Sequence, residues 1–447
     1  MAETLTYHYN YPSLLTKSQN EAGLLLSNYN EIQKKESSCY FWGKLKDPYL
    51  VARALINLSN VVQSSFNLSP FQLALLKDPI VTAGSEKIRF EGFSHCAGVY
   101  ARVDILEAGL DGEFPEPGTT NVDFNQGMIS SLSTIQRNEN VMLSVGPKEL
   151  SLIQDGHVTK ERKVPLPVKW IKALTSVQMF LSDSEQQHSF NKIQAIQLFK
   201  TIPTGKPKAD YYLISRAGKP AFSPVKSASG IYVGGIHRLR LLEPLLPFID
   251  QLKVFAHPGM QSTTWQLYFG GLRFSISLSR DTWRGFSGEG AALDALLEDI
   301  PESWLTSAEK YCQANQQFNA TLFAINEGLD RTLVDQLTAR LSAIGLLGFD
   351  LDENAFFYRR LPFKTERILS LNPRLKDAEK LLAEGKVNIL QKASDKIEAS
   401  VKGTGVDHVV VIEGGRERCT CTWFSRNQGQ RGSCKHILAV KKKITEL

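Results

Sequence analysis

The sequence predicts an α+β protein built from several domains. Its 447 residues exceed the length that one hydrophobic core usually organises. Segments with apolar residues at helical spacing alternate with short strand-like runs bounded by turn residues. Near the C-terminus, two β-branched or alternating runs around a glycine pair precede a short apolar helix. We therefore expect a large mixed α/β N-terminal region, a helical, winged-helix-like middle region and a small C-terminal ββα module.

Composition and pattern place the domain boundaries. Residues 1–38 are polar and rich in Asn, Tyr and Ser, which predicts an arm. Residues 39–300 repeat the order helix, hairpin, strand, so we expect a mixed α+β region of two related halves, near 40–175 and 185–300. Residues 301–386 read as helical. Residues 387–447 should form a small sheet that includes the C-terminal module.

The middle region contains a pattern typical of nucleic-acid-binding folds. The predicted helix 331–344 is followed directly by a strand, a turn and a second strand over 345–361. A helix followed by a two-stranded ribbon resembles the back half of a winged-helix domain. Arg359 and Arg360 would then lie on the wing as candidate phosphate contacts, and a purely structural scaffold is the alternative.

The C-terminal module carries a four-ligand metal pattern. Cys419-Thr-Cys421 is followed, after twelve residues, by Cys434-Lys-His436. On a strand over 416–423 that returns from the turn Gly414-Gly415, both thiols would share one face, because side chains alternate with period two. Residues i and i+2 lie about 200° apart around a helix, so Cys434 and His436 could not both face one ion from within a helix. Cys434 should therefore precede the last helix, and His436 should lie in its first turn.

Three thiolates and one imidazole complete a tetrahedral zinc shell. The alternatives are a disulfide or four residues with no metal, and the lack of a secretory signal disfavours the disulfide. We expect one Zn²⁺ held by Cys419, Cys421, Cys434 and His436. Its role should be structural, because no coordination position remains open for a catalytic water.

These residues also resemble a known family. The Cys-x-Cys…Cys-x-His spacing, the wording Cys419-Thr-Cys421-Thr-Trp423 and the segment 431–436 are similar to the bacterial form of the SWIM zinc finger. The stretches 283–290 and 357–363 occur in the same order in that family. The resemblance implies a bacterial, non-enzymatic protein found alongside MoxR-type AAA+ ATPases and von Willebrand A-domain proteins. Ser433 stands where relatives tend to have proline.

Positive charge is concentrated in the module. The chain has a net charge of +6, and residues 401–447 hold nine Lys or Arg against four Asp or Glu, which leaves +5. Such a surface attracts phosphate, although a solvated basic surface is the alternative. Besides the two wing arginines, the candidate nucleic-acid contacts are Arg416, Arg418, Lys435, Lys441, Lys442 and Lys443.

Other function classes find little support in the sequence. We find no signal peptide and no run of about eighteen apolar residues, so we expect a cytoplasmic protein without a membrane partner. Neither Gly92-Phe-Ser94 nor Gly285-Phe-Ser287 completes a nucleophile elbow. The glycine-rich stretch 283–290 is either an anion-binding loop or an ordinary loop and helix cap. Two functions remain: nucleic-acid binding through the basic module, or a protein–protein adaptor in which zinc is only structural.

Overall fold

The computed structural model describes most of the chain. The described residues are 14–17, 22–25, 39–64, 79–164, 166, 168–205, 207–216, 219–281, 285–286, 300–361, 373–403, 405–429 and 432–445. The chain divides into two compact units. The larger unit comprises residues 1–166, 183–285 and 358–362, and the second unit comprises 167–182, 286–357 and 363–447.

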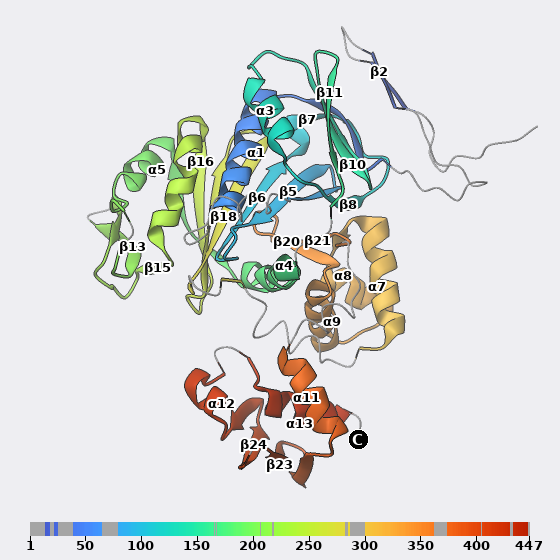
Figure 1. Ribbon diagram of the computed structural model, residues 1–447, viewed down its shortest axis with the longest axis vertical. Coiled ribbons are helices and arrows are strands. Elements are labelled where there is room, and N and C mark those ends of the chain that lie inside the picture. Colours follow the sequence, from blue (N-terminus) through green and yellow to red (C-terminus); the bar gives the residue numbers. More distant parts are fainter. Residues whose placement is uncertain are drawn as a thin grey trace, which may run out of the picture. The chain divides into compact units, whose positions relative to one another are not determined.

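The larger unit is built mainly from antiparallel sheets (Figure 1). In spatial order, its eight-stranded sheet consists of β12 (Glu185–Asn191), β16 (Gln251–Ala256), β17 (Ser262–Tyr268), β18 (Leu272–Ser279), β6 (Val99–Ile105), β5 (Lys87–Phe93), β4 (Ile80–Gly84) and β8 (Gly118–Asn121). Four of these strands come from residues 80–121 and four from residues 185–279. They meet where β6 pairs with β18. The relatedness of the two halves stays a prediction.

Two smaller sheets complete the larger unit. A five-stranded sheet has the order β11 (His157–Arg162), β10 (Glu149–Gln154), β9 (Val141–Val145), β3 (Phe41–Leu45) and β7 (Leu110–Glu113). A three-stranded sheet has the order β14 (Lys219–Ser223), β13 (Tyr211–Arg216) and β15 (Ile231–Val233). Within the predicted arm, β1 (Leu14–Lys17) and β2 (Ala22–Leu25) form a hairpin.

Helix α1 (Pro48–Gln63) covers one face of the large sheet, against β5, β6 and β18 (Figure 1). Local residues account for the start of this helix. The side chain of Asp47 caps it by accepting a hydrogen bond of 2.9 Å from the Leu50 amide, and Pro48 occupies the first turn. Among the described residues, this unit has four further helical segments: the 3₁₀ helix η1 (Glu107–Gly109), α3 (Gln126–Thr134), α5 (Lys192–Phe199) and the 3₁₀ helix η2 (Ile236–Phe248). A single apolar core joins these elements.

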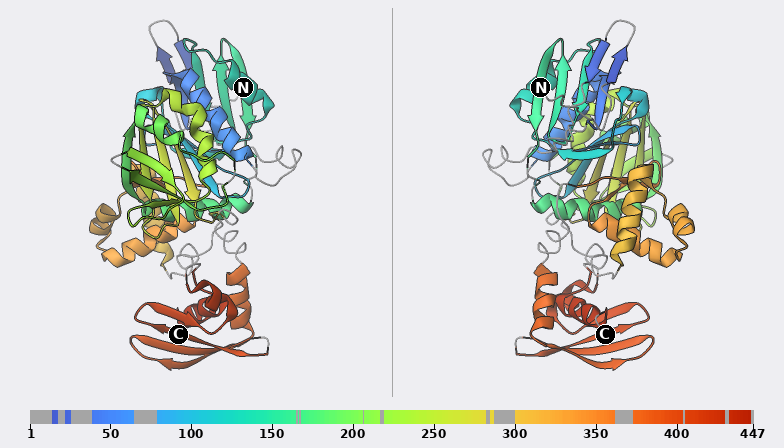
Figure 2. Two further views of the ribbon diagram at one scale, coloured as in Figure 1. Left: turned by 90° about the vertical axis from the view of Figure 1, so that its left-hand side faces the viewer. Right: turned by 90° about the vertical axis from the view of Figure 1, so that its right-hand side faces the viewer.

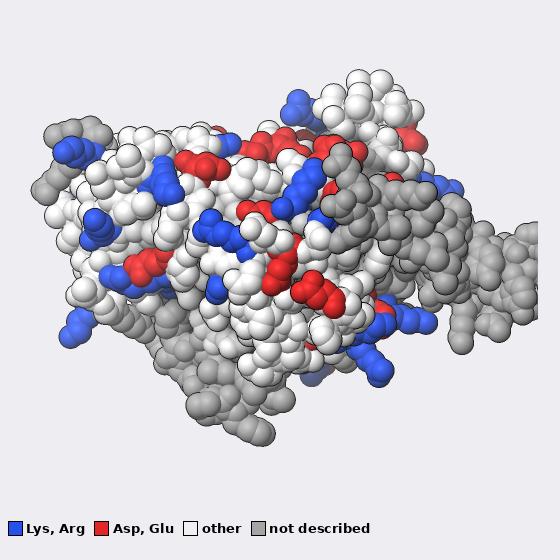
Figure 3. Space-filling view, turned by 90° about the horizontal axis from the view of Figure 1, so that it is seen from above, with Lys and Arg blue, Asp and Glu red and all other residues white. Residues whose placement is uncertain are grey.

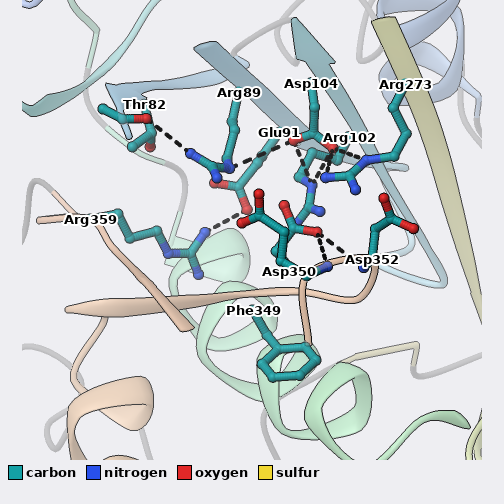
Figure 4. Close-up of polar contacts among 12 residues, drawn as sticks. Thr82, Arg89, Glu91, Arg102, Asp104, Arg273, Phe349, Asp350, Asp352 and Arg359 are labelled. Carbon is teal, nitrogen blue, oxygen red and sulfur yellow. Dashed lines mark hydrogen bonds and ion pairs between the residues drawn. The ribbon is translucent and has the colours of Figure 1, made fainter. Parts of the chain in front are cut away.

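A cluster of charged side chains is buried on the large sheet. Asp104 lies 3.0 Å from Arg102 and 2.8 Å from Arg273, and Glu91 accepts a 2.5 Å hydrogen bond from Arg359 (Figure 4). Glu91 also accepts a 2.5 Å hydrogen bond from the Tyr100 hydroxyl. The two acids are fully buried, and the three arginines are at most 2% exposed. On β6, therefore, the apolar face and the polar face of an alternating strand are both buried.

The second unit begins with a helical segment. Its elements are α4 (Val168–Ser182), α7 (Glu302–Asn315), β19 (Gln317–Phe318), α8 (Ala320–Glu327), α9 (Arg331–Ala343), β20 (Leu347–Asp350) and β21 (Ala355–Tyr358). The expected helix 331–344 and the ribbon after it are both present. The three strands form a small sheet in the order β19-β21-β20. Gln178 of α4 accepts a hydrogen bond of 2.7 Å from the Phe349 amide, which ties α4 to this ribbon.

The C-terminal part of the second unit is a module of one sheet and three helices. The sheet is antiparallel in the order β22 (Val387–Lys392), β23 (Lys396–Lys402), β24 (Asp407–Glu413) and β25 (Arg416–Cys419). Helix α13 (Lys435–Thr445) contacts all four strands, and α11 (Pro373–Ala383) packs on α13, so both helices lie on one side of the sheet (Figure 2). The third helix, α12 (Thr422–Asn427), follows β25.

The predicted fold class was wrong. The N-terminal region is organised by large antiparallel sheets rather than by a mixed α/β arrangement. Consecutive strands such as β16, β17 and β18 pair directly with each other, which needs only short turns and no crossover helix. The C-terminal module is a four-stranded sheet with three helices and not a ββα unit, because β22 and β23 extend the predicted hairpin and α11 joins its core.

Candidate metal centre

The four predicted ligands lie together in the C-terminal module. Their ligand atoms all lie within 4.8 Å of one another, and all four residues are buried. Nδ1 of His436 is 3.7 Å from Sγ of Cys419 and 4.0 Å from Sγ of Cys434. Ligands at 2.0–2.3 Å from a tetrahedral zinc ion stand about 3.6–3.8 Å apart, so the group could hold such an ion through Nδ1 of the histidine.

Cys419 is placed by the end of a hairpin. The Gly414-Gly415 turn has positive φ at both positions, 54° and 73°, as the tight hairpin turn predicted from this glycine pair requires. Strand β25 then returns beside β24, where Cys419 pairs with Val410. One residue after Cys419, the Thr420 hydroxyl accepts a hydrogen bond of 3.0 Å from the Val409 amide. This bond fixes the pairing register of β25 against β24.

Cys421 does not lie on the strand face as predicted. The strand ends at Cys419, and Cys421 is the N-cap of α12, with its sulfur 3.4 Å from the Phe424 amide that donates to it. This cap starts α12 at Thr422, so the helix begins within the stretch 416–423 that was predicted to be a strand. The two sulfurs therefore converge through a change of backbone direction and not through strand alternation.

Cys434 and His436 lie where the sequence predicts them. Cys434 directly precedes α13, its carbonyl accepts the Leu438 amide at 3.0 Å, and His436 is in the first turn. Ser433 is buried, and its hydroxyl donates a hydrogen bond of 2.6 Å to Glu417 of β25. This bond joins the segment that carries one ligand pair to the strand that leads to the other pair.

The thiols suit a cation. A hydrogen bond from Cys419 lowers the pKa of the Cys434 thiol to about 4, and the same contact raises the pKa of Cys419. Burial raises the pKa of Cys421. Without a cation, one thiolate therefore forms readily while its neighbours hold their protons. A divalent ion at the centre of the group would stabilise all three thiolates and release those protons.

The cysteines of the cluster belong to the apolar core of the module. Apolar side chains of α11, the sheet and α13 surround the cysteines, among them Leu375, Val401, Val410, Ile437 and Leu438. The ring of His408 on β24 lies against that of His436, with centroids 4.4 Å apart. Each ligand is therefore held by an element that packs on this core.

The candidate phosphate contacts are dispersed, and several are paired. Arg416 and Arg418 are exposed on β25. Lys435 lies 3.2 Å from Asp377 and Lys442 lies 2.7 Å from Glu379, both acids of α11. The other two lysines of α13 are also engaged: Lys441 pairs with Glu417, and Lys443 donates to the Val387 carbonyl.

The two predicted wing arginines differ. Arg360 is exposed, whereas Arg359 is 1% exposed and ion-paired with Glu91, so Arg359 cannot serve as a surface phosphate contact in this arrangement. The sequence prediction failed here because the partner acid is 268 residues away in the chain. Most of the glycine-rich stretch 283–290 lies outside the described residues, and its role stays open.

Comparisons with known proteins give a limited answer. No family model and no curated protein matches the chain. Among solved structures, it is similar to the proliferating cellular nuclear antigen of Entamoeba histolytica, with 10% identity, a TM-score of 0.36, and coverage of 54% of this chain and 99% of that one. It is also similar to the DNA polymerase sliding clamp of Caulobacter crescentus, with 11% identity, a TM-score of 0.37, and coverage of 85% and 84%.

No helix within the described ranges is long and apolar enough to cross a membrane.

Proposed function

We propose that the protein holds one structural zinc ion through Cys419, Cys421, Cys434 and His436. The observation that supports this proposal is the convergence of four buried ligand atoms within 4.8 Å of one another. Three sulfurs and one nitrogen fill a tetrahedral shell, which leaves no position for a substrate or a catalytic water. The proposed role of the ion is to stabilise the module, and the proposed role of the protein is non-enzymatic.

Metal analysis tests the zinc proposal. Cys434→Ser removes one ligand from a closed shell, so the purified variant should lose most of its zinc. Cys96→Ser is the matched control, because this partly exposed cysteine lies outside the cluster, and it should keep one zinc per chain. Equal zinc content in both variants would refute the assignment.

We further propose that the zinc-bearing module binds nucleic acid through phosphate contacts. Support comes from the net +5 of residues 401–447 and from the exposure of Arg416 and Arg418. Elsewhere, the surface shown in Figure 3 has basic and acidic side chains interspersed, with no large patch of one sign. Phosphate contacts carry little sequence information, so the proposed binding has little sequence preference.

Salt titration tests this second proposal. Replacing Arg416 and Arg418 by alanine should weaken binding to duplex DNA and reduce the slope of log K against log salt by up to about 0.9 for each lost phosphate contact. Zinc content should not change, because neither residue is a ligand. Lys219→Ala with Lys226→Ala, two exposed lysines of the larger unit, is the control. A wild-type protein that binds neither duplex nor single strand at low salt rules the function out.

A protein–protein adaptor is the second candidate function. The observation that favours it is the pairing of the α13 lysines with acids of the same module, which reduces the charge offered to phosphate. The resemblance to SWIM-domain proteins suggests AAA+ ATPases and von Willebrand A-domain proteins as partners. A pulldown from the native cell with and without nuclease separates the two functions, because an adaptor keeps its partners after nuclease treatment.

A further inference from the structure

A cavity of ≈ 600 Å³ opens in the C-terminal module beside the metal cluster. It lies among α11, the ends of β22–β24, the start of α12 and the start of α13. Cys421, Cys434 and His436 contribute to its wall, so the cluster and the cavity share residues. Its size is that of pockets that accept small organic ligands, about 300–1,000 Å³, and one nucleotide fits within that range.

The cavity is lined by more cations than anions. Five basic residues face two acids, Asp377 and Glu384; the basic residues are Arg374, Lys380, Lys386, Lys402 and Lys435. The formal sum is +3, and a cluster of three thiolates with one Zn²⁺ contributes about −1, which leaves about +2. Asp377 pairs with Lys435 at 3.2 Å, and Glu384 pairs with Lys386 at 2.7 Å. Both acids are therefore engaged, and the excess charge in the cavity is positive.

Arg374 and Trp423 form a cation–π pair in the lining of the cavity. The guanidinium of Arg374 lies over the ring of Trp423, with Cζ 4.7 Å from the ring centroid. Nη1 of Arg374 also donates a hydrogen bond of 2.8 Å to the carbonyl of Ser433, the residue before the ligand Cys434. Aromatic rings and guanidinium groups are both groups on which nucleobases stack, and here the guanidinium is also fixed by a backbone hydrogen bond.

We propose that this cavity receives one phosphorylated nucleotide of a single-stranded nucleic acid. The base stacks on the wall formed by Arg374 and Trp423, and the phosphates lie near Lys386 and Lys402. This inference rests on the proposed nucleic-acid function and locates its contact surface. A polyglutamate peptide would meet the same cations but has no aromatic ring to stack on Arg374 and Trp423.

The cavity shares residues with the metal cluster, so single-strand binding in it should depend on zinc. Arg374 is held by the Ser433 carbonyl, and Trp423 follows the ligand Cys421 by two residues in α12. Removing the ion would free the segment around Ser433, which holds Arg374, and the start of α12, which carries Trp423. Single-strand binding should therefore be lost on chelation and recovered when zinc is returned.

The test measures binding of a 3′-labelled oligothymidylate to the full chain by fluorescence anisotropy at low salt. Lys386→Ala with Lys402→Ala should weaken binding at least tenfold and reduce the salt slope by about 1.4, or 0.7 for each phosphate on a single strand. Lys376→Ala with Lys392→Ala is the matched control, since both lysines are exposed in the same module and neither lines the cavity. The control should bind as the wild type does.

A second variant tests the stacking wall. Trp423→Leu should weaken binding roughly 5- to 150-fold, the range for loss of one stacked base, and should leave the salt slope unchanged. Trp423→Phe should recover much of the affinity. Retention of one zinc per chain shows that each variant is folded in this region. Free AMP as competitor shows whether a mononucleotide also enters the cavity.

The outcomes that overturn the inference differ in whether the proposed nucleic-acid function also fails. If the cavity variants bind as the wild type does while Arg416→Ala with Arg418→Ala loses binding, the cavity assignment falls and the nucleic-acid function remains. If the wild type binds duplex DNA but no single-stranded oligonucleotide, the cavity assignment falls and the nucleic-acid function again remains. If it binds neither, or binds polyglutamate in their place, both fall together.

Discussion

At the scale of single residues, the buried ion pair between Glu91 and Arg359 joins two positions that are 268 residues apart. Removing one partner of such a pair leaves the other charge buried without compensation, which costs roughly 3–5 kcal/mol. Arg359→Met should therefore lower the free energy of unfolding by that order, measured by urea denaturation. Adding Glu91→Gln to this variant should recover part of the loss, because no uncompensated charge remains. Additive losses would contradict the pairing.

Glu161 on β11 predicts a pH effect. Burial, with a smaller contribution from Asp123, raises the pKa of this carboxyl from 4.5 to about 7, although Asn125 donates a hydrogen bond to it. The folded state then keeps a proton that the unfolded chain has lost, so this contribution is favourable below pH 4.5 and is lost as the pH rises towards 7.

Unfolding midpoints in urea at pH 5 and pH 8 check that sign. Glu161→Gln should lose less stability between the two pH values than the wild type does. Glu86→Gln, at an exposed glutamate, is the control and should follow the wild type. A variant as pH-sensitive as the wild type would show that Glu161 is not responsible.

At the scale of elements, the hairpin β24–β25 depends on its turn. Gly415 has a φ of 73°, a conformation that costs a residue with a branched side chain roughly 1–2 kcal/mol. Gly415→Val should lower the melting temperature of the zinc-loaded module, whereas Gly415→Asn should be nearly neutral, because Asn tolerates left-handed backbone. Thermal unfolding followed by tryptophan fluorescence distinguishes them, and equal effects of Val and Asn would contradict the turn geometry.

Local rules account for the elements whose causes are local. The glycine pair before β25 and the i, i+2 argument for Cys434 and His436 depend on a few neighbouring residues and were predicted, and the cap and proline of α1 are of the same kind. Where the cause is distant, no local pattern indicates it. Nothing near Arg359 indicates Glu91, and nothing near Lys435 indicates Asp377. The residues that line the cavity, such as Arg374 and Lys402, were missed for the same reason, because no spacing relates them.

Antiparallel sheets were missed for a related reason. Strands such as β5 and β6 alternate apolar and charged residues, a pattern that predicts one face in water. Here the charged face is buried as well, since arginines and acids on neighbouring strands neutralise one another. Pairing of β6 with β18 joins residues about 170 positions apart, and periodicity carries no information on such partners.

At the scale of the whole molecule, removing zinc should unfold the C-terminal module and leave the larger unit folded. The residues of the C-terminal module surround the metal cluster, and structural zinc in small modules supplies about 10 kcal/mol or more. The larger unit has its own apolar core. Chelation followed by limited trypsin digestion should cleave within 373–447 and leave a resistant fragment that carries the larger unit. Readdition of zinc before trypsin is the control, and digestion of the whole chain would contradict this division.

The discontinuity of the larger unit has a consequence for how the protein is made. The chain leaves this unit after residue 166, returns at 183, leaves again after 285 and returns for residues 358–362, where Arg359 pairs with Glu91. A ribosome that has released the first 300 residues has therefore not yet supplied the last part of that unit. Its final consolidation waits for residue 362, and only then does the zinc-binding segment emerge. All eight strands of the large sheet end by Ser279, so at that stage the sheet lacks only the partner of Glu91. Contacts of such long sequence separation form slowly, so we expect the larger unit without Arg359 to be the species that chaperones bind during synthesis.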